Sequence, residues 1–262
     1  MKNIIFPLII TFSFLSCFQK SDKMIWADEF EYDGLPDPDK WSFDVGDHGW
    51  GNNELQFYTK EKTENARVEN GRLIIEAHQD SSFKKGFSSA KLHTKGNASW
   101  QYAYIEIKAK LPRGVGTWPA IWMMPEENKY GGWPKSGEID IMEHVGYDQG
   151  VIHGTIHTEA FNHRKGTQKG AQIQVPTCSD AFHVYAIDWL EDKIDFYKDG
   201  ELYHTFENTG KNFEEWPFDH PFYLILNIAV GGDWGGTEGV DPDIWPQRME
   251  IEYVRVYSEK PD

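Results

Sequence analysis

The sequence is poor in cysteine, with only Cys17 and Cys178 among its 262 residues. Cys17 stands directly after an N-terminal apolar run that reads as a targeting segment, which leaves Cys178 as the only other thiol of the mature chain. We therefore expect no intrachain disulfide. We interpret Cys178 as a packed, unreactive thiol.

Basic residues are also few, since 26 Lys and Arg stand against 42 Asp and Glu, and the formal net charge is −16. A protein of this charge repels polyanions, so nucleic acid is excluded as an expected partner. The acidic balance alone does not identify a substrate.

Beyond residue 21 the sequence lacks a second apolar segment, a low-complexity tract, a repeat and a linker that would divide it. Helical patterns of ten or more residues are lacking as well. We therefore expect residues 25–259 to form a single domain, which is a normal size for one large all-β unit. We expect a monomer.

The N-terminal segment has the features of an export signal. Lys2 precedes an almost uninterrupted apolar run over residues 4–15, which is too short to span a bilayer. The run ends in Leu15-Ser16-Cys17, and a small residue before a cysteine is similar to the cleavage site of bacterial lipoproteins. Phe14 departs from the leucine that is usual at its position.

This segment leads to an expectation about location. Residues 1–16 would be the signal peptide, Cys17 would carry the lipid, and residues 17–24 would form a tether. The protein would be exported and anchored by lipid to a bacterial membrane, at the cell surface or in the periplasm. The alternative is an ordinary secretory signal with an incidental cysteine.

Local patterns beyond this segment are those of β-strands. Asn70-Gly71 separates two strand-like segments, as in a two-residue hairpin turn. Residues 104–111 alternate between apolar and polar, and residues 222–230 form the continuous apolar run of a central strand covered on both sides. Further segments with strand character are 73–77, 152–158, 184–189, 193–197, 201–204 and 249–257. Many short strands with turns between them predict an all-β, two-sheet sandwich.

Aromatic residues are abundant, and the 11 Trp, 12 Tyr and 16 Phe can fill the core and also stack on sugar rings. Trp122 lies inside an apolar run and is assigned to the core. Trp118 and Trp133 are candidate stacking platforms, although a core position is the open alternative for any single tryptophan. Two loops rich in Gly and Trp, residues 48–53 and 231–236, have a composition that favours function over packing.

Three carboxylates fall within six residues, at Glu138, Asp140 and Glu143. Residues i and i+2 of a strand share a face, so Glu138 and Asp140 lie together while Glu143 points to the other side. One extra residue, a β-bulge near residues 141–142, would bring Glu143 onto the same face. The two glutamates could then reach the separation of about 5–5.5 Å that retaining glycoside hydrolysis needs. The alternative is an edge strand with a solvated acidic face.

The segment 138–143 resembles the catalytic signature of glycoside hydrolase family 16, in the longer, bulged version of its laminarinase-like members. The resemblance extends over nearly all of the mature chain, through residues 26–30, 51–56, 117–120, 154–157 and 253–257. It implies a concanavalin-like β-jelly-roll sandwich with a concave glycan-binding cleft. It also implies retaining endo-hydrolysis of β-1,3-glucan, of mixed-linkage β-1,3/1,4-glucan, or of both, with no cofactor for catalysis.

By this resemblance, Glu138 matches the nucleophile, Glu143 matches the general acid that later becomes the base, and Asp140 tunes both. The physical chemistry agrees, because two nearby carboxylates cannot both ionise cheaply. Charge on Glu138 raises the proton affinity of Glu143, and esterification of Glu138 removes that charge so that Glu143 can act as a base.

The resemblance also implies residues that contact the glycan. The matching cleft positions are Asn53, Trp118, Trp133 and His157, with Glu54 and Trp234 as weaker matches. The alternation of residues 152–158 independently places His157 on one face with His153 and Thr155. Lys91 stands where laminarinase-like members commonly carry arginine, and it keeps the charge but lacks the planar fork of donors.

A structural calcium ion away from the cleft is a further implication of the resemblance. Its ligands would be Glu29, the carbonyl of Gly71 and Glu252, an oxygen set that suits calcium. Glu252 stands where a shorter aspartate is expected.

Two alternatives to glucan hydrolysis stay open. The first is a hydrolase of the same family that acts on agar, carrageenan or xyloglucan, although the net charge disfavours an anionic polymer. The second is a non-catalytic, surface glycan-binding lipoprotein that uses the same cleft.

Overall fold

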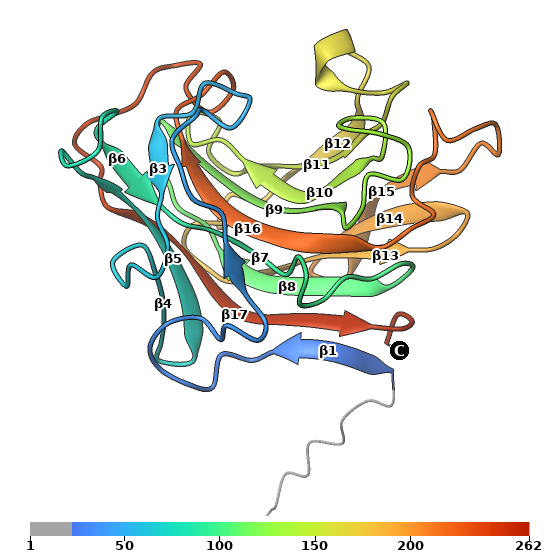
Figure 1. Cartoon of the computed structure of the whole chain (residues 1–262), viewed down its shortest axis with the longest axis horizontal. Coiled ribbons are helices and arrows are strands. Elements are labelled where there is room, and N and C mark those ends of the chain that lie inside the picture. Colours follow the sequence, from blue (N-terminus) through green and yellow to red (C-terminus); the bar gives the residue numbers. More distant parts are fainter. Residues whose placement is uncertain (1–22, 262) are drawn as a thin grey trace, which may run out of the picture.

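The computed structural model describes residues 23–261, and nearly all of its regular structure is β-strand. Two sheets pack on one another as a sandwich, with β1 and β17 at the bottom of the view and β9, β10 and β11 above them (Figure 1). The only helical segment in the described range is the short 3₁₀ helix η1 (His163–Lys165). The predicted all-β, two-sheet architecture is confirmed.

The larger sheet has ten strands in the order β15-β14-β13-β8-β17-β5-β6-β3, with β1 paired to β17 and β4 to β5. Its strands are β1 (Met24–Asp28), β3 (Gln56–Tyr58), β4 (Ala66–Glu69), β5 (Arg72–Gln79), β6 (Phe87–Ser89), β8 (Tyr104–Lys110), β13 (His183–Trp189), β14 (Lys193–Lys198), β15 (Glu201–Glu207) and β17 (Gln247–Tyr257). The pair β3 and β6 is parallel.

The smaller sheet has seven strands in the order β12-β11-β10-β9-β16-β7-β2. Its strands are β2 (Ser42–Phe43), β7 (Lys91–His93), β9 (Thr117–Pro125), β10 (Glu138–His144), β11 (Val151–His157), β12 (Lys169–Gln174) and β16 (Phe222–Val230). The order brings β10 between β9 and β11, so the acidic strand lies inside the sheet. The alternative of an acidic edge strand is therefore wrong.

The hydrophobic core lies between the two sheets, and β9 shows how the smaller sheet contributes to it. Ile121 and Met123 are fully buried in the core. Trp118, Ala120 and Trp122 alternate with them and line a cavity on the opposite face. This period of two is the one that a strand imposes on its side chains.

Two expectations about the core need correction. Trp122 was assigned to the core, but it is only partly buried and lines the cavity. β16 is an interior strand as expected, yet its Asn227 and Ala229 line the same cavity, so part of its second face lies under a cleft. The apolar sequence predicted burial at these positions because an aromatic cleft and a hydrophobic core have similar amino-acid compositions.

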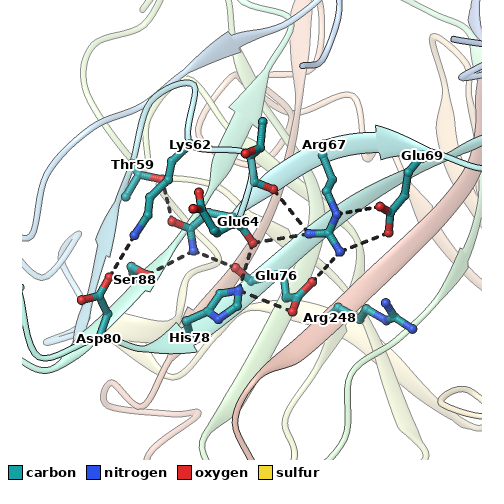
Figure 2. A network of polar contacts seen from close by, with 12 residues as sticks. Thr59, Lys62, Glu64, Arg67, Glu69, Glu76, His78, Asp80, Ser88 and Arg248 are labelled. Carbon is teal, nitrogen blue, oxygen red and sulfur yellow. Dashed lines mark hydrogen bonds and ion pairs between the residues drawn. The ribbon is translucent and has the colours of Figure 1, made fainter. Parts of the chain in front are cut away.

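Local turn chemistry and ion pairs fix the edge of the larger sheet. Asn70 and Gly71 have φ of 54° and 71°, which are the positive values of the predicted hairpin turn between β4 and β5. Arg67 on β4 pairs with Glu69 at 3.0 Å and with Glu76 on β5 at 2.9 Å (Figure 2). Cross-strand pairs of opposite charge support the register of such a hairpin.

Several expectations concern residues beyond those that the structure describes. The signal peptide 1–16, the lipidation residue Cys17 and all but the last two residues of the tether 17–24 lie outside this range. Cys178 is free and fully buried, as expected, and burial raises the pKa of its thiol. Among the described residues, no helix is long and apolar enough to cross a membrane.

Candidate active site

The acidic strand β10 contains the predicted bulge. The three-residue step from Asp140 to Glu143 lies opposite the two-residue step from Thr155 to His153 on β11. The register against β9 shifts in the same segment. The extra residue brings Glu143 to the face that carries Asp140 and Glu138, and all three carboxylates line the cavity. The bulge that was inferred from parity is confirmed.

The other side of the bulge anchors it in the core. Ile141 and Met142 are adjacent in sequence, and both are buried. Gly137 precedes the strand with φ of 88°, and a Cβ atom there would lie 2.8 Å from the ring of Phe218. Only glycine fits this conformation and this space, so the chain enters β10 in one fixed direction.

Each glutamate receives a hydrogen bond from an indole. Trp133 donates its Nε1–H to Glu138 Oε2 at 2.7 Å, and Trp118 donates its Nε1–H to Glu143 Oε1 at 3.0 Å. Trp133 comes from the loop before β10 and Trp118 from β9. Donors of this kind stabilise the ionised form of a carboxyl group and fix its orientation.

His157 on β11 lies against the other two members of the cluster. Its Nε2 is 3.3 Å from Asp140 Oδ2 and 3.7 Å from Glu138 Oε1. His157 and Asp140 are nearly inaccessible to solvent, at 6% and 3% exposure. His157 Nε2 is therefore a neighbour of both carboxylates, Asp140 and Glu138, on one face of the sheet.

Burial dominates the electrostatics of the three carboxyl groups. It raises the pKa of Glu143 to about 7, with a smaller contribution from the charge of Glu138 and opposing effects of His157 and Trp118. Burial and the charge of Asp140 raise the pKa of Glu138 to about 8, against His157 and Trp133. Burial and the charge of Glu143 place the pKa of Asp140 well above its ordinary range. The cluster therefore holds protons at neutral pH.

The distribution of those protons follows from the immediate neighbours. Glu138 has the shorter indole hydrogen bond, at 2.7 Å, and it also faces the imidazole of His157. Glu143 has the longer bond, at 3.0 Å. Part of the raised pKa of Glu138 comes from the charge of Asp140, and Asp140 is neutral at neutral pH because its own pKa lies well above its ordinary range. With Asp140 neutral, the shorter indole hydrogen bond favours the negative charge on Glu138, which leaves Glu143 as the member that retains a proton.

The cluster lies in a cavity of about 930 Å³. Its walls come from β9, β10, β11 and β16, and from the two Gly- and Trp-rich loops, which the structure brings side by side. The backbone N–H of Asp233 donates to the carbonyl of Asn52 at 2.7 Å, and Asn53 Nδ2 donates to Asp233 Oδ1 at 2.8 Å. Trp234 packs edge-on against Trp118 at 5.4 Å.

Not every predicted contact residue reaches the cavity. Asn53 is held by Asp233, and its neighbour Asn52 is the residue that lines the wall. Glu54 does line the cavity, but its carboxylate accepts hydrogen bonds from Gln56 at 2.6 Å and Asn52 at 3.2 Å, and burial raises its pKa. Glu54 thus braces the loop as well as facing the cleft.

Lys91 occupies a cage of aromatic rings in the wall. Its Nζ lies 4.5 Å from the ring centre of Trp50 and 5.0 Å from that of Trp122, and it pairs with Asp44 at 3.0 Å. It is 8% exposed. A desolvated cation over indole faces is a favourable arrangement, so Lys91 holds the two indoles in place in addition to facing the cavity.

Some lining residues had no sequence prediction. Trp50 and Asn227 line the wall near Lys91, and Asn227 accepts a hydrogen bond from Trp122 Nε1 at 2.7 Å. Trp50 belongs to a loop that the sequence marked as functional, so its composition was a usable signal. Arg164 on η1 lies 4.6 Å from the ring centre of Trp133, and no local pattern points to that contact.

Two of the three expected calcium ligands, Glu29 and Glu252, are paired with cations in this arrangement. Both oxygens of Glu29 accept hydrogen bonds from the guanidinium of Arg255, at 2.7 and 2.9 Å. Glu252 is paired with Lys108 at 2.6 Å. Carboxylates whose charge is already matched by cations are poor candidates for a hard divalent ion.

This geometry can perform acid and nucleophilic catalysis on a chain of sugars. A carboxylate with compensated charge and a protonated carboxyl group share one face of a cleft that is lined by indole rings. The first can attack a carbon atom while the second protonates a leaving oxygen.

Comparisons with known proteins agree with this chemistry. The family model described as Glycosyl hydrolases family 16 matches residues 53–255. The "Beta-glucanase" of Rhodothermus marinus is 54% identical over 250 residues, which cover 91% of this chain and 87% of that protein.

Solved structures resemble the chain as well. The laminarinase from Rhodothermus marinus matches with a TM-score of 0.88 and 53% identity, and the match covers 91% of this chain and 98% of that one. A variant of a non-specific endo-β-1,3(4)-glucanase, co-crystallised with 1,3-β-D-cellotriosyl-glucose, matches with a TM-score of 0.86 and 49% identity. That match covers 90% of this chain and 95% of the other.

Proposed function

This chain belongs to glycosyl hydrolases family 16, and we propose that it cleaves β-1,3-glucan and mixed-linkage β-1,3/1,4-glucan internally, with retention of anomeric configuration. It is a glycoside hydrolase that needs no cofactor for catalysis. The single observation that carries the proposal is the bulge in β10, which puts Glu138, Asp140 and Glu143 on one face of an aromatic cleft.

In the first step, an oxygen of Glu138 attacks the anomeric carbon and the bond from that carbon to the leaving oxygen breaks. Glu143 gives its proton to the leaving oxygen, so the reducing-end fragment departs as an alcohol. Trp133 donates to the second oxygen of Glu138 and thereby fixes the carboxylate for attack. The product is a glycosyl ester on Glu138.

In the second step, Glu143 takes a proton from water, and the water oxygen attacks the anomeric carbon. The ester bond to Glu138 breaks, and the carboxylate is released. The pKa of Glu143 is raised partly by the charge of Glu138, and that charge is absent from the ester. Glu143 is therefore a stronger acid in the intermediate and can exist as the base that this step needs.

Asp140 and His157 adjust this exchange. Asp140 raises the pKa of Glu138 when it is charged, and His157 lowers it. A proton held between Asp140 and Glu138 can move to Asp140 as the nucleophile ionises. The pair thus sets the charge state of Glu138 without touching the leaving group.

The test uses Glu138→Gln and Glu143→Gln in the purified protein. Each substitution should lower turnover on laminarin and barley β-glucan by orders of magnitude while the fold is kept, as measured by released reducing sugar and circular dichroism. Azide should restore product formation by the Glu143 variant on an activated aryl glucoside, as a β-glycosyl azide, because the activated leaving group needs no acid. Near wild-type activity of either variant on glucan would overturn the assignment.

The same assay separates the rival functions. Initial rates on laminarin, barley β-glucan, lichenan and agarose rank the polysaccharides directly. Binding to laminarin without any release of reducing sugar would favour a non-catalytic glycan-binding protein.

We also propose that the protein is exported and lipid-anchored through Cys17. Support comes from the apolar run over residues 4–15 and the small residue before Cys17. Metabolic labelling with a palmitate analogue should mark the wild type and leave Cys17→Ser unmarked. Absence of label on the wild-type protein would contradict lipidation of Cys17.

A further inference from the structure

We propose that Glu138, Asp140 and His157 form a binding site for a divalent transition metal ion, Zn²⁺ in particular, and that the bound ion reversibly blocks the cleft. One ligand atom from each residue lies within 4.8 Å of the other two, the only such group of three among the described residues. The site goes beyond the hydrolytic activity, since catalysis there needs no metal.

The distances suit a small ion. Zinc binds imidazole nitrogen at about 2.0–2.1 Å and carboxylate oxygen at about 2.0–2.2 Å, so neighbouring ligand atoms of a tetrahedral site are about 3.4 Å apart. The observed separations from His157 Nε2 are 3.3 Å to Asp140 Oδ2 and 3.7 Å to Glu138 Oε1. Shifts of a few tenths of an ångström would complete the three-ligand face.

A second observation points to a ligand at the same place. Asp140 Oδ2 is buried and has no hydrogen-bond partner, although Asp140 is only 3% exposed. This oxygen is the one that faces His157 Nε2. A buried carboxylate oxygen without a donor is costly, and a proton or a cation between Asp140 and its neighbours removes that cost.

The mixed donor set selects the kind of ion. One imidazole and two carboxylates suit Zn²⁺ and its transition-metal neighbours, whereas Mg²⁺ and Ca²⁺ favour six or more oxygen ligands. The cleft leaves room for a fourth ligand from solvent. His157 Nδ1 has no hydrogen-bond partner to fix its ring, which argues for micromolar rather than nanomolar affinity.

Occupancy would stop the reaction by a simple route. A lone pair of Glu138 that coordinates the ion cannot attack an anomeric carbon, and the ion would lie beside Glu138 in the cavity that the substrate must enter. Inhibition should therefore compete with β-glucan and reverse on addition of a chelator. This inhibition readout rests on the proposed hydrolytic function, whereas metal binding itself does not.

The experiment is isothermal titration of the untagged, chelator-treated full-length protein with ZnCl₂ at pH 7. We expect one saturable site in the wild type and at least about tenfold weaker binding in both His157→Gln and Asp140→Asn. His183→Gln is the matched control, because His183 also lies beside a carboxylate, 2.8 Å from Asp199, but it belongs to β13 of the larger sheet and does not line the cavity. It should bind Zn²⁺ like the wild type, and MgCl₂ should not produce the same isotherm.

Several outcomes would overturn the proposal. These are the absence of saturable one-to-one binding, equal affinity in folded His157→Gln, or loss of the site in His183→Gln. Circular dichroism identifies a variant that fails to fold, and either cleft variant alone suffices. If the metal-free protein hydrolyses glucan but binds no Zn²⁺, the metal site is wrong and the proposed function stands. If the protein binds Zn²⁺ but is inactive on every glucan, the proposed function is wrong and the metal site stands.

Discussion

The indole Nε1–H of Trp133 donates to Glu138 Oε2 at 2.7 Å, from a loop that ends in the strand of its acceptor. Trp118 holds Glu143 in the same manner from the neighbouring strand β9. The two tryptophans that the sequence suggests as stacking platforms thus use their Nε1–H groups to orient the two catalytic carboxyl groups. Each donor should have a separate signature in the pH dependence of hydrolysis.

Replacing Trp133 with Phe removes the donor to Glu138 and keeps a ring. The hydrogen bond lowers the pKa of Glu138, so its loss raises that pKa. The nucleophile must be ionised, and the acidic limb of the kcat/KM profile should therefore move to higher pH, with a roughly tenfold loss of kcat. An unchanged acidic limb in a pH series on laminarin would contradict the role of the donor.

Replacing Trp118 with Phe should act on the opposite limb. Trp118 lowers the pKa of Glu143, so the substitution raises it, and the general acid keeps its proton to higher pH. The alkaline limb of kcat/KM should shift upward, while the acidic limb stays close to that of the wild type. Movement of the same limb in both tryptophan variants would mean that the two carboxyl groups are assigned wrongly.

Much of this arrangement could be predicted because it follows from strand periodicity. The period of two, applied to Glu138, Asp140 and Glu143, required one extra residue for all three to share a face, and the register shift in β10 supplies it. The hairpin at Asn70-Gly71 follows from residues that tolerate positive φ. These inferences need only neighbours in sequence, and the parity argument was independent of the family resemblance.

Contacts between distant segments could not be predicted in this way. The sequence predicts a core position for Trp122, because neither the neighbouring residues nor the alternation along β9 reveals that one face of this strand borders a cleft. The cage around Lys91 joins β7, β9 and the loop of Trp50, and Arg164 meets Trp133 from η1. Such pairings depend on the packing of whole elements, which a single sequence does not encode locally.

Lys91 offers a test of its aromatic cage. Lys91→Met removes the charge between Trp50 and Trp122 and breaks the ion pair with Asp44. A desolvated cation–π contact is worth about 1–2 kcal/mol, so KM for laminarin should rise roughly 5- to 30-fold with a smaller change in kcat. Lys91→Arg is the matched control and should keep KM within a few-fold. Equal KM values in all three proteins would show that the cage does not shape the binding surface.

The buried cluster should also lower the stability of the protein at neutral and alkaline pH. The folded-state pKa of Glu138 is raised, to about 8, so the carboxyl group contributes its full share of stability below the unfolded pKa and loses it as the pH rises. Glu138→Gln cannot ionise, and its Tm should exceed that of the wild type by a few degrees at pH 8. At pH 4 the two melting temperatures should agree. A lower Tm of the variant at pH 8 would mean that the ionised carboxylate is stabilised by its donors.

The bulge can be tested by changing its length in both directions. Insertion of one Gly after Ile141 should turn Glu143 toward the core side, because one residue reverses the face of everything that follows it. The inserted variant should have no detectable activity. Deletion of Met142 restores plain alternation and keeps Glu143 in the cleft, so some activity should survive, although the lost packing of a fully buried Met lowers stability by about 2–5 kcal/mol. Thermal melting distinguishes a misplaced acid from an unfolded chain. Full activity in the folded insertion variant would show that the parity of β10 does not place the catalytic acid.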